Sequence, residues 1–325
     1  MKKLLKVLGI ILCSILLIII VIIAYIKTAL PDVGPAPELT VDKSPVNVER
    51  GRYLANCVMS CMDCHSTRDV SKYSMPMVLS ARGQGGERFD QTMGFPGVFY
   101  SANITPSGIS GWTDGEIYRA ITTGVRRNGK PIFPVMPYHA YGFANPEDVK
   151  SVIAYIRSLQ PIANVVPESA ADFPMNIILN TVPKKAEPMP LPASGDSLAK
   201  GRYLFTIAAC HDCHTPFEKG KFDETLALAG GRIFPTPGGM VTSANITPDK
   251  ETGIGSWTRE FFIQHFAMYR DSATAHRVVN PSELQTMMPW TLYGNMTDSD
   301  LANMYAYIRT IQPIKHSVTK WKAGH

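Results

Sequence analysis

The first pattern along the chain is one long apolar run close to its start. Val7 to Ile26 read VLGIILCSILLIIIVIIAYI, twenty positions without a charged side chain. At a helical rise of about 1.5 Å per residue, this run is long enough to cross a hydrocarbon core of about 30 Å. A cleaved signal peptide is the alternative, but its apolar region is about 7 to 15 residues long and ends at small residues. Because Lys27 follows the run directly, we predict an uncleaved transmembrane helix within residues 1–29.

The charges beside this run predict its orientation. Lys2, Lys3 and Lys6 precede it, and Lys27 is the single lysine that follows it closely. By the positive-inside rule the N-terminus lies in the cytoplasm, so everything beyond the helix is periplasmic at a bacterial inner membrane. Cys13 lies inside the run and is interpreted as a small apolar membrane residue. Residues 30–46, which are rich in proline and lack periodicity, are predicted to form an extended spacer.

Helix signals are clear in the rest of the chain. Asn145 precedes a proline, an acidic turn and the amphipathic stretch VKSVIAYIRSL, as an N-cap does. Thr297 with Asp300 starts a second such helix, and Thr113 with Glu116 has the spacing of a capping box. No segment alternates with the two-residue period of a strand. The predicted fold class is therefore all-α.

The chain also repeats itself. Its landmarks recur in one order: GRYLANCVMSCMDCH (51–65) as GRYLFTIAACHDCH (201–214), SANITP (101–106) again at 243–248, GWT (111–113) as SWT (256–258), VMPYHAYG (135–142) as MMPWTLYG (287–294), and AYIRSLQPI (154–162) as AYIRTIQPI (306–314). A period near 150 residues indicates a domain duplication, since solenoid repeats are much shorter. We therefore expect tandem domains at 47–162 and 196–325, joined by a proline-rich linker at 163–195.

Each copy carries one CxxCH motif, the attachment signature of c-type haem. Two thiols three residues apart on one helical turn can form thioethers with the vinyl groups, and the next histidine then faces the iron. Redox dithiols, zinc sites and structural disulfides are the alternatives for a CxxC pair. The duplicated motif favours two covalently attached haem c groups, held by Cys61, Cys64, Cys210 and Cys213, with His65 and His214 as proximal iron ligands.

The repeat also nominates the sixth iron ligand. Met136 and Met288 both stand before proline and after the CxxCH motif at similar spacing, so we predict two His/Met haems. Met287 is the competitor for Met288. The histidine alternatives have no partner at the same place in the other copy; they are His139, His265 and His276. Cys57, four residues before Cys61, is expected to be a buried thiol on the same helical face as Cys61; a ligand or a crosslinking site is the alternative.

The formal charge of +5 does not indicate a nucleic-acid partner. Without the four lysines around the apolar run, 28 basic residues face 27 acidic ones. The body therefore lacks the basic field that nucleic-acid binding requires.

These residues resemble class I c-type cytochromes. More narrowly, GGRIFPTPGGMVTSANITPDKETGIGSWTREFF and RRNGKPIFPVMPYHAYG are similar to the cytochrome c subunits of membrane-bound alcohol and gluconate dehydrogenases. The resemblance implies a small helical domain around each haem. It also implies that the haem and its propionates are lined by Asn103, Trp112, Asn245 and Trp257.

The sequence thus predicts a membrane-anchored, periplasmic dihaem electron carrier with redox protein partners. It would connect a respiratory donor with a terminal oxidase or other acceptor, freely or as a subunit of a respiratory or dehydrogenase complex. It would not transform a substrate itself. The alternative is a dihaem cytochrome c peroxidase, which must leave one iron open to peroxide.

Overall fold

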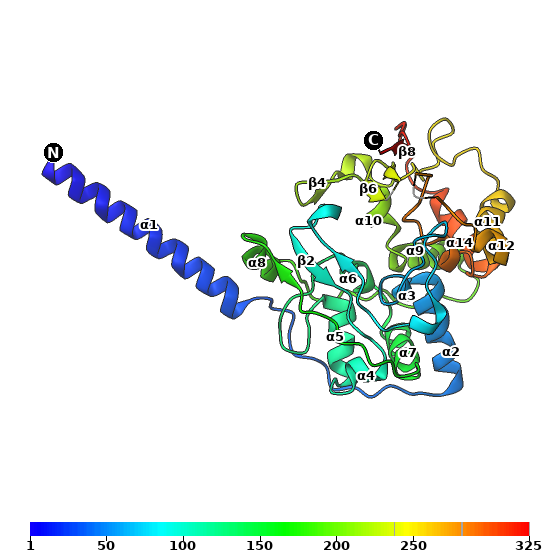
Figure 1. The fold of residues 1–325 in the computed structure, drawn as a ribbon, viewed down its shortest axis with the longest axis horizontal. Coiled ribbons are helices and arrows are strands. Elements are labelled where there is room, and N and C mark those ends of the chain that lie inside the picture. Colours follow the sequence, from blue (N-terminus) through cyan, green and yellow to red (C-terminus); the bar gives the residue numbers. More distant parts are fainter. Residues whose placement is uncertain (237, 281, 325) are drawn as a thin grey trace.

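The computed structural model describes residues 1–236, 238–280 and 282–324. One helix, α1 (Lys2–Ala29), projects from a rounded body and contacts the short helix α8 (Met175–Ile178) at its base (Figure 1). Only Ile23 and Ile26 of this helix are partly buried. Among the described helices, α1 is the one long and apolar enough to cross a membrane. The prediction of an apolar spanning helix near the N-terminus is therefore supported.

The body consists of two repeats of short helices. The first repeat contains α2 (Pro45–Tyr53), the π-helix η1 (Leu54–Val58), α3 (Cys61–Cys64), η2 (Leu79–Ala81), η3 (Gln91–Met93), α4 (Pro106–Ile109), α5 (Asp114–Thr123), α6 (Tyr138–Tyr141) and α7 (Pro146–Arg157). The connecting segment contains α8 (Met175–Ile178) and η4 (Leu179–Thr181). The second repeat contains α9 (Ser197–Ile207), α10 (Cys210–His214), η5 (Glu224–Leu226), α11 (Arg259–Ala267), η6 (Met268–Arg270), α12 (Ser272–Ala275), α13 (Trp290–Tyr293) and α14 (Asp298–Ile308).

The predicted helix starts are confirmed. The Asn145 side chain accepts a hydrogen bond from the backbone amide of Glu147 and caps α7. Thr297 caps α14 by accepting from the amide of Asp300. Thr113 and Glu116 form a complete capping box at the start of α5. Caps of this kind satisfy amides that the helix itself leaves unpaired.

The first and last helices of each repeat cross at a glycine. A Cβ atom on Gly51 of α2 would lie 1.8 Å from the carbonyl oxygen of Ser151 in α7. A Cβ atom on Gly201 of α9 would lie 1.9 Å from the carbonyl oxygen of Asn303 in α14. Only glycine permits this close backbone approach, which explains the glycine of the GRYL segment in both copies.

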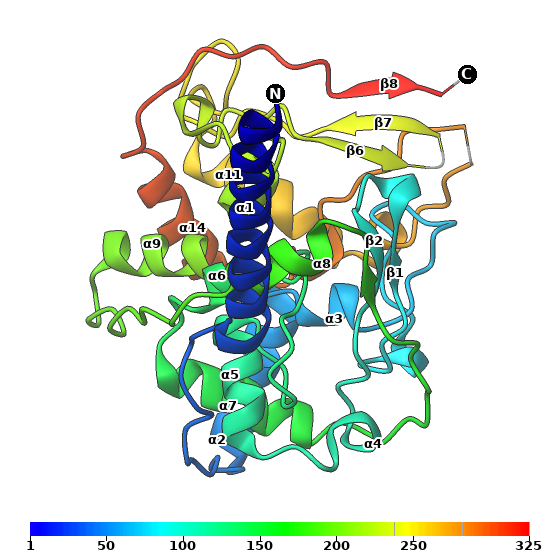
Figure 2. The ribbon, with the colours of Figure 1, turned by 90° about the vertical axis from the view of Figure 1, so that its left-hand side faces the viewer.

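The all-α prediction is wrong in one respect, because the body also contains small antiparallel sheets (Figure 2). In the first repeat, β1 (Arg88–Phe89) pairs with β2 (Gly97–Tyr100), and β3 (Ala170–Ala171) of the connecting segment pairs with the other edge of β2. In the second, β6 (Ile233–Thr236), β7 (Gly239–Thr242) and β8 (Trp321–Ala323) pair in that order. A further hairpin joins β4 (Phe217–Glu218) to β5 (Lys221–Phe222). Strands of two to four residues are too short to show an alternating pattern.

A π-helix absorbs the one-residue difference between the two copies. The first copy has one more residue than the second between its glycine and its first CxxCH cysteine. In η1 the amide of Met59 bonds to the carbonyl of Leu54 at 2.7 Å, a five-residue step. A π-turn takes up one extra residue within a helix. Both CxxCH motifs therefore start from equivalent places.

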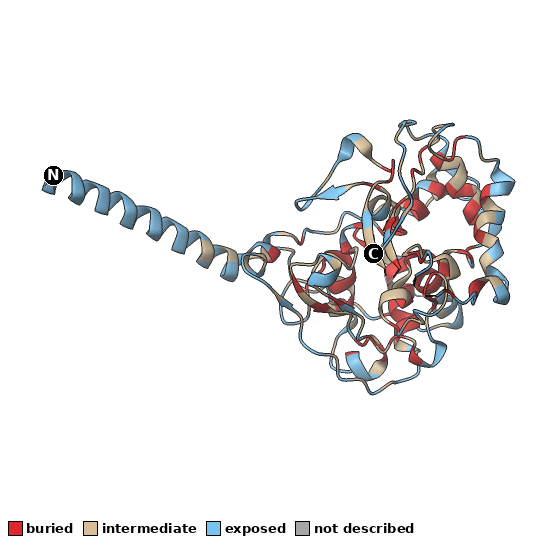
Figure 3. Ribbon diagram, turned by 45° about the horizontal axis from the view of Figure 1, so that its top comes forward, coloured by how far each residue is buried: buried red, intermediate tan, exposed pale blue. Residues whose placement is uncertain are grey.

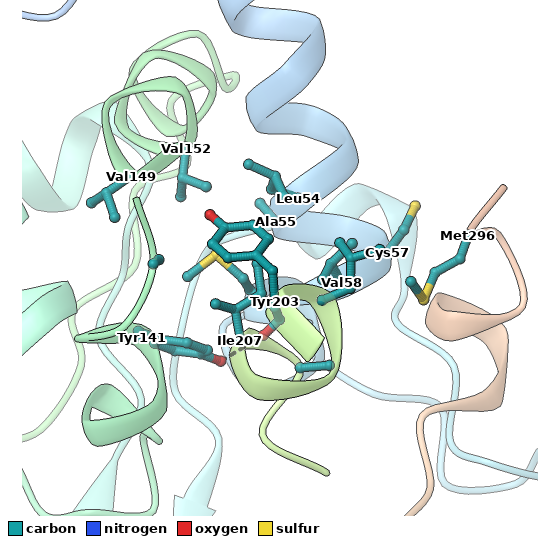
Figure 4. Close-up of a cluster of buried hydrophobic side chains, with 14 of the residues drawn as sticks. Leu54, Ala55, Cys57, Val58, Tyr141, Val149, Val152, Tyr203, Ile207 and Met296 are labelled. Atoms are coloured by element: carbon teal, nitrogen blue, oxygen red, sulfur yellow. Dashed lines mark hydrogen bonds between the residues drawn. The ribbon is translucent and has the colours of Figure 1, made fainter. Parts of the chain in front are cut away.

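The segment after α1, residues 30–44, forms no helix or strand, and its second half packs on the first repeat. Val41 is buried, and its amide donates to a carboxylate oxygen of Asp114 at 3.0 Å. Burial is concentrated in the body, whereas α1 is exposed along nearly all its length (Figure 3). The hydrophobic core is continuous across the repeats, since Leu54 and Val149 share one cluster with Tyr203 and Ile207 (Figure 4).

Candidate haem sites

Both CxxCH motifs start after a residue in the left-handed conformation. Ser60 has φ 50° and Ala209 has φ 53°, and each is the N-cap of the short helix that carries the motif. This reversal turns the motif helix away from the helix before it. Cys57 lies before the reversal, within η1. The prediction that it shares a helical face with Cys61 is therefore wrong. The predicted burial of Cys57 is confirmed, in the core cluster that also holds Met296 (Figure 4).

Each motif histidine is oriented by a backbone carbonyl. Nδ1 of His65 lies 2.7 Å from the carbonyl oxygen of Ala102, and Nδ1 of His214 lies 2.7 Å from that of Ala244. A carbonyl oxygen can only accept, so Nδ1 carries the proton and Nε2 is left as the metal-binding nitrogen. Burial lowers the pKa of both imidazoles, which favours the neutral form that a metal requires.

The SANITP landmark supplies these carbonyl groups, a role that the sequence analysis did not assign. The side-chain oxygen of Asn103 accepts hydrogen bonds from the amide and the hydroxyl group of Thr105. Its amide nitrogen donates to the carbonyl oxygen of Ile162 at 2.8 Å. These bonds join the loop to the chain that follows α7 and hold Ala102 in place. The recurrence of SANITP in both copies is the sequence signal from which a structural role of this loop could have been predicted.

The second copy repeats this arrangement. Asn245 accepts from the amide and hydroxyl group of Thr247 and donates to the carbonyl oxygen of Ile314 at 2.8 Å. Both asparagines, which were predicted to line the haem, are seen in the structure to hold their loops. Trp112 and Trp257 are partly buried and pack against the core.

The two candidate methionines occupy equivalent loops. The carbonyl oxygen of Met136 accepts from the amide of Tyr138 at 2.8 Å, and that of Met288 accepts from the amide of Trp290 at 2.8 Å. The prolines that follow them stand directly before α6 and α13, at the N-cap positions. Both methionines are partly buried against the core. Met288, rather than Met287, is therefore the structural counterpart of Met136.

The histidines without a counterpart have other contacts. Nε2 of His139 lies 2.9 Å from the carboxylate of Asp212, across the two repeats. His276 bonds through Nδ1 to the carbonyl oxygen of Ser272 at 2.9 Å. His265 packs edge-on against a tryptophan ring.

The residues of each site fit a haem c group better than the alternatives. All six cysteines lie in the described residues, and none forms a disulfide. Burial raises the pKa of Cys61 and Cys64 to about 12 and that of Cys213 to about 11, whereas redox dithiols have lowered pKa values. Within residues 1–236, 238–280 and 282–324, no three His, Cys, Asp or Glu side chains gather as a metal site. A lone imidazole beside two thiols suits an iron whose other ligands come from a macrocycle.

Comparison with known proteins agrees with this chemistry. The cytochrome c family profile matches residues 198–312. The chain is 31% identical over 268 residues to a diheme cytochrome c-type protein of Cereibacter sphaeroides, covering 78% of this chain and 83% of that protein. It is 29% identical over 279 residues to the fructose dehydrogenase cytochrome subunit of Gluconobacter japonicus, with 82% and 52% covered.

A third relative is the gluconate 2-dehydrogenase cytochrome c subunit of Pantoea cypripedii. It is 29% identical over 246 residues, which cover 70% of this chain and 52% of that subunit. The chain therefore spans about half the length of these two dehydrogenase subunits.

Proposed function

This chain belongs to the cytochrome c family, and from that premise we propose that it is a membrane-anchored dihaem electron carrier with two tandem cytochrome c domains. The observation that carries the proposal is the duplicated geometry of the sites. Each CxxCH histidine is fixed through Nδ1 by the SANITP alanine carbonyl, at 2.7 Å in both copies. The family profile covers the second copy, and the matching geometry supports the proposal of a second such site in the first copy.

The residues have distinct roles in this proposal. Cys61 and Cys64 would hold one haem and Cys210 and Cys213 the other, while His65 and His214 would bind iron through Nε2. The haem iron would supply reversible one-electron oxidation and reduction. Met136 and Met288 would each give a thioether ligand to an iron, which would keep substrates away and bias the potentials upward. Asn103, Trp112, Asn245 and Trp257 remain proposed haem-lining residues.

The partners follow from the relatives and from α1. The fructose and gluconate relatives are named as cytochrome subunits of dehydrogenases. By analogy, the electron donor of this chain is a membrane-bound dehydrogenase, and the acceptor is a terminal oxidase or another cytochrome. Helix α1 anchors the chain in the inner membrane, with the N-terminus in the cytoplasm and the haem domains in the periplasm.

No structural observation favours the dihaem peroxidase. A peroxidase needs one iron open to peroxide, whereas both repeats place a methionine in the same loop. None of the relatives described above is named as a peroxidase.

Membrane vesicles from cells with and without this gene test the proposal. We expect sugar- or alcohol-driven haem reduction and oxygen uptake to fall when the gene is deleted, and to return with the intact gene. We expect the purified chain to carry two haems by mass, and its reduced form not to bind carbon monoxide. One haem per chain, or peroxide turnover by the purified protein, would contradict the proposal.

A further inference from the structure

The second repeat contains a strap that reaches the first repeat. From SANITP to the candidate methionine, the second copy is ten residues longer than the first. We call residues 271–280 and 282–287 the strap. In the strap, the amide of Val279 donates to the carbonyl oxygen of Ser71 at 2.8 Å. The carbonyl oxygen of Arg277 accepts from the amide of Tyr73 at 2.9 Å. The guanidinium group of Arg277 also lies 4.5 Å from the centre of the Tyr73 ring.

A buried glutamine fastens the strap to the same loop of the first repeat. Gln285 is 3% exposed. Its side-chain oxygen accepts from the amide of Ser74 at 2.8 Å, and its side-chain nitrogen donates to the carbonyl oxygen of Lys72 at 2.8 Å. A buried amide needs such partners, since leaving it unpaired costs free energy. The strap is therefore matched to this loop.

The loop in turn holds the backbone around Met288. The hydroxyl group of Ser74 donates to the carbonyl oxygen of Met288 at 2.6 Å and accepts from the amide of Trp290 at 3.0 Å. One buried side chain from the first repeat thus bonds on both sides of the intervening proline. Ser74 has φ +64°, an unfavourable conformation for a residue other than glycine, which surrounding contacts must maintain.

The Met136 loop is built differently. Its amide bonds to the carbonyl oxygen of Phe133 at 3.3 Å, and its carbonyl bonds to the amide of Tyr138. Among the described residues, no side chain of the second repeat bonds to the Met136 backbone. The two candidate ligand loops therefore differ in their dependence on the opposite repeat.

We propose that Ser74 and Gln285 are positioning residues for the sixth ligand of the second haem. Ser74 holds the Met288 backbone from the opposite repeat, and Gln285 fastens the strap to the loop that carries Ser74. The inference rests on the proposed function, because Met288 must be that ligand. It predicts that the strength of the Met288–iron bond depends on the contact between repeats, whereas that of the Met136–iron bond does not. The extra residues of the second copy then serve to lock its methionine loop.

Competition with imidazole tests this inference on the full haem-loaded chain. Free imidazole competes with a thioether for ferric iron, so the loss of the methionine-to-iron charge-transfer band reports how firmly each methionine is held. We expect two phases in the wild type. In Ser74→Ala one phase moves to about tenfold lower imidazole concentration, equal to about 1.4 kcal/mol, and the other stays unchanged. Gln285→Glu, which loses the donors but keeps the acceptor, shifts the same phase in the same direction.

Control variants separate the possible failures. Met288→Ala should remove one of the two phases, which assigns that phase to the second haem. Ser80→Ala changes an exposed serine near the same loop and should shift neither phase. If Met288→Ala leaves the whole band intact, the proposed ligand itself is wrong. If Met288→Ala removes half of the band but neither Ser74→Ala nor Gln285→Glu shifts a phase by more than about twofold, the positioning role is wrong. Equal shifts of both phases would also overturn it.

Discussion

The hydroxyl group of Tyr53 donates a hydrogen bond to the Asp300 carboxylate at 2.6 Å, across the two repeats. The reciprocal bond joins the hydroxyl group of Tyr203 in the second repeat to Asp148 in the first, also at 2.6 Å. Each carboxylate is buried at the start of its helix and also pairs with a cation of its own repeat. Such a self-complementary contact is what a two-fold symmetric interface produces. The two Tyr–Asp hydrogen bonds are therefore related to each other as the two halves of a two-fold contact are.

Removing either hydroxyl group should weaken this contact. We expect Tyr53→Phe and Tyr203→Phe each to lower the free energy of unfolding by about 1.5–3 kcal/mol, since each removes a hydrogen bond to a buried charged group. Chemical denaturation of the haem-loaded protein measures this change. Tyr100→Phe, at a partly exposed tyrosine, is the control. Losses below about 0.5 kcal/mol, as for an ordinary surface change, would contradict the interpretation.

The glycines at the helix crossings should not tolerate a methyl group. In Gly51→Ala and Gly201→Ala the new Cβ atom meets a backbone carbonyl oxygen, which cannot move aside as a side chain can. We expect each to cost at least about 2 kcal/mol of unfolding free energy. Gly111→Ala is the matched control, because its nearest neighbour is the end of a flexible arginine. Equal unfolding midpoints for Gly51→Ala and Gly111→Ala would show that the helices can separate without cost.

The buried thiol of Cys57 should make stability depend on alkaline pH. Burial raises the pKa of Cys57 from 9.0 to about 11. Below pH 9 the thiol is protonated in both states, so its full contribution to stability is present. Between about pH 9 and pH 11 it ionises in the unfolded chain first, and the contribution is lost as the pH rises through the folded pKa.

Two pKa units correspond to about 2–3 kcal/mol. We therefore expect the stability of the wild type, relative to Cys57→Ala, to fall by about that amount from pH 8 to pH 11. Urea titrations of both proteins across this range measure the difference. Parallel pH profiles would place the Cys57 thiol in contact with water.

Short contiguous sequence motifs correctly predicted the helices whose starts depend on neighbouring residues. The caps at Asn145 and Thr297 and the repeated CxxCH motifs are contiguous patterns, and the structure forms each element where they predict it. The strands escaped prediction because they are short and because β3 and β8 come from residues far along the chain. The bond between Ser74 and Gln285 joins positions 211 residues apart, a relation that no single-sequence period reveals.

The π-helix η1 shows another limit of prediction from sequence. The extra residue of the first copy was visible, but a loop, a bulge or a π-turn could each absorb it. Burial of all five η1 residues resolves the choice, since a loop there would leave backbone groups unpaired in the core. The prediction that Cys57 and Cys61 share one helical face was wrong for a different reason: Ser60, in the left-handed conformation, separates the two helices that carry them.

The methionine-to-iron charge-transfer band of the ferric protein tests the central claim most directly. We expect the wild type to show the intensity of two His/Met haems per chain. Met136→Ala and Met288→Ala should each remove half of this band, and the double variant all of it. Retention of the full band in either single variant, or a spectrum of bis-histidine or high-spin haem in the wild type, would contradict the account.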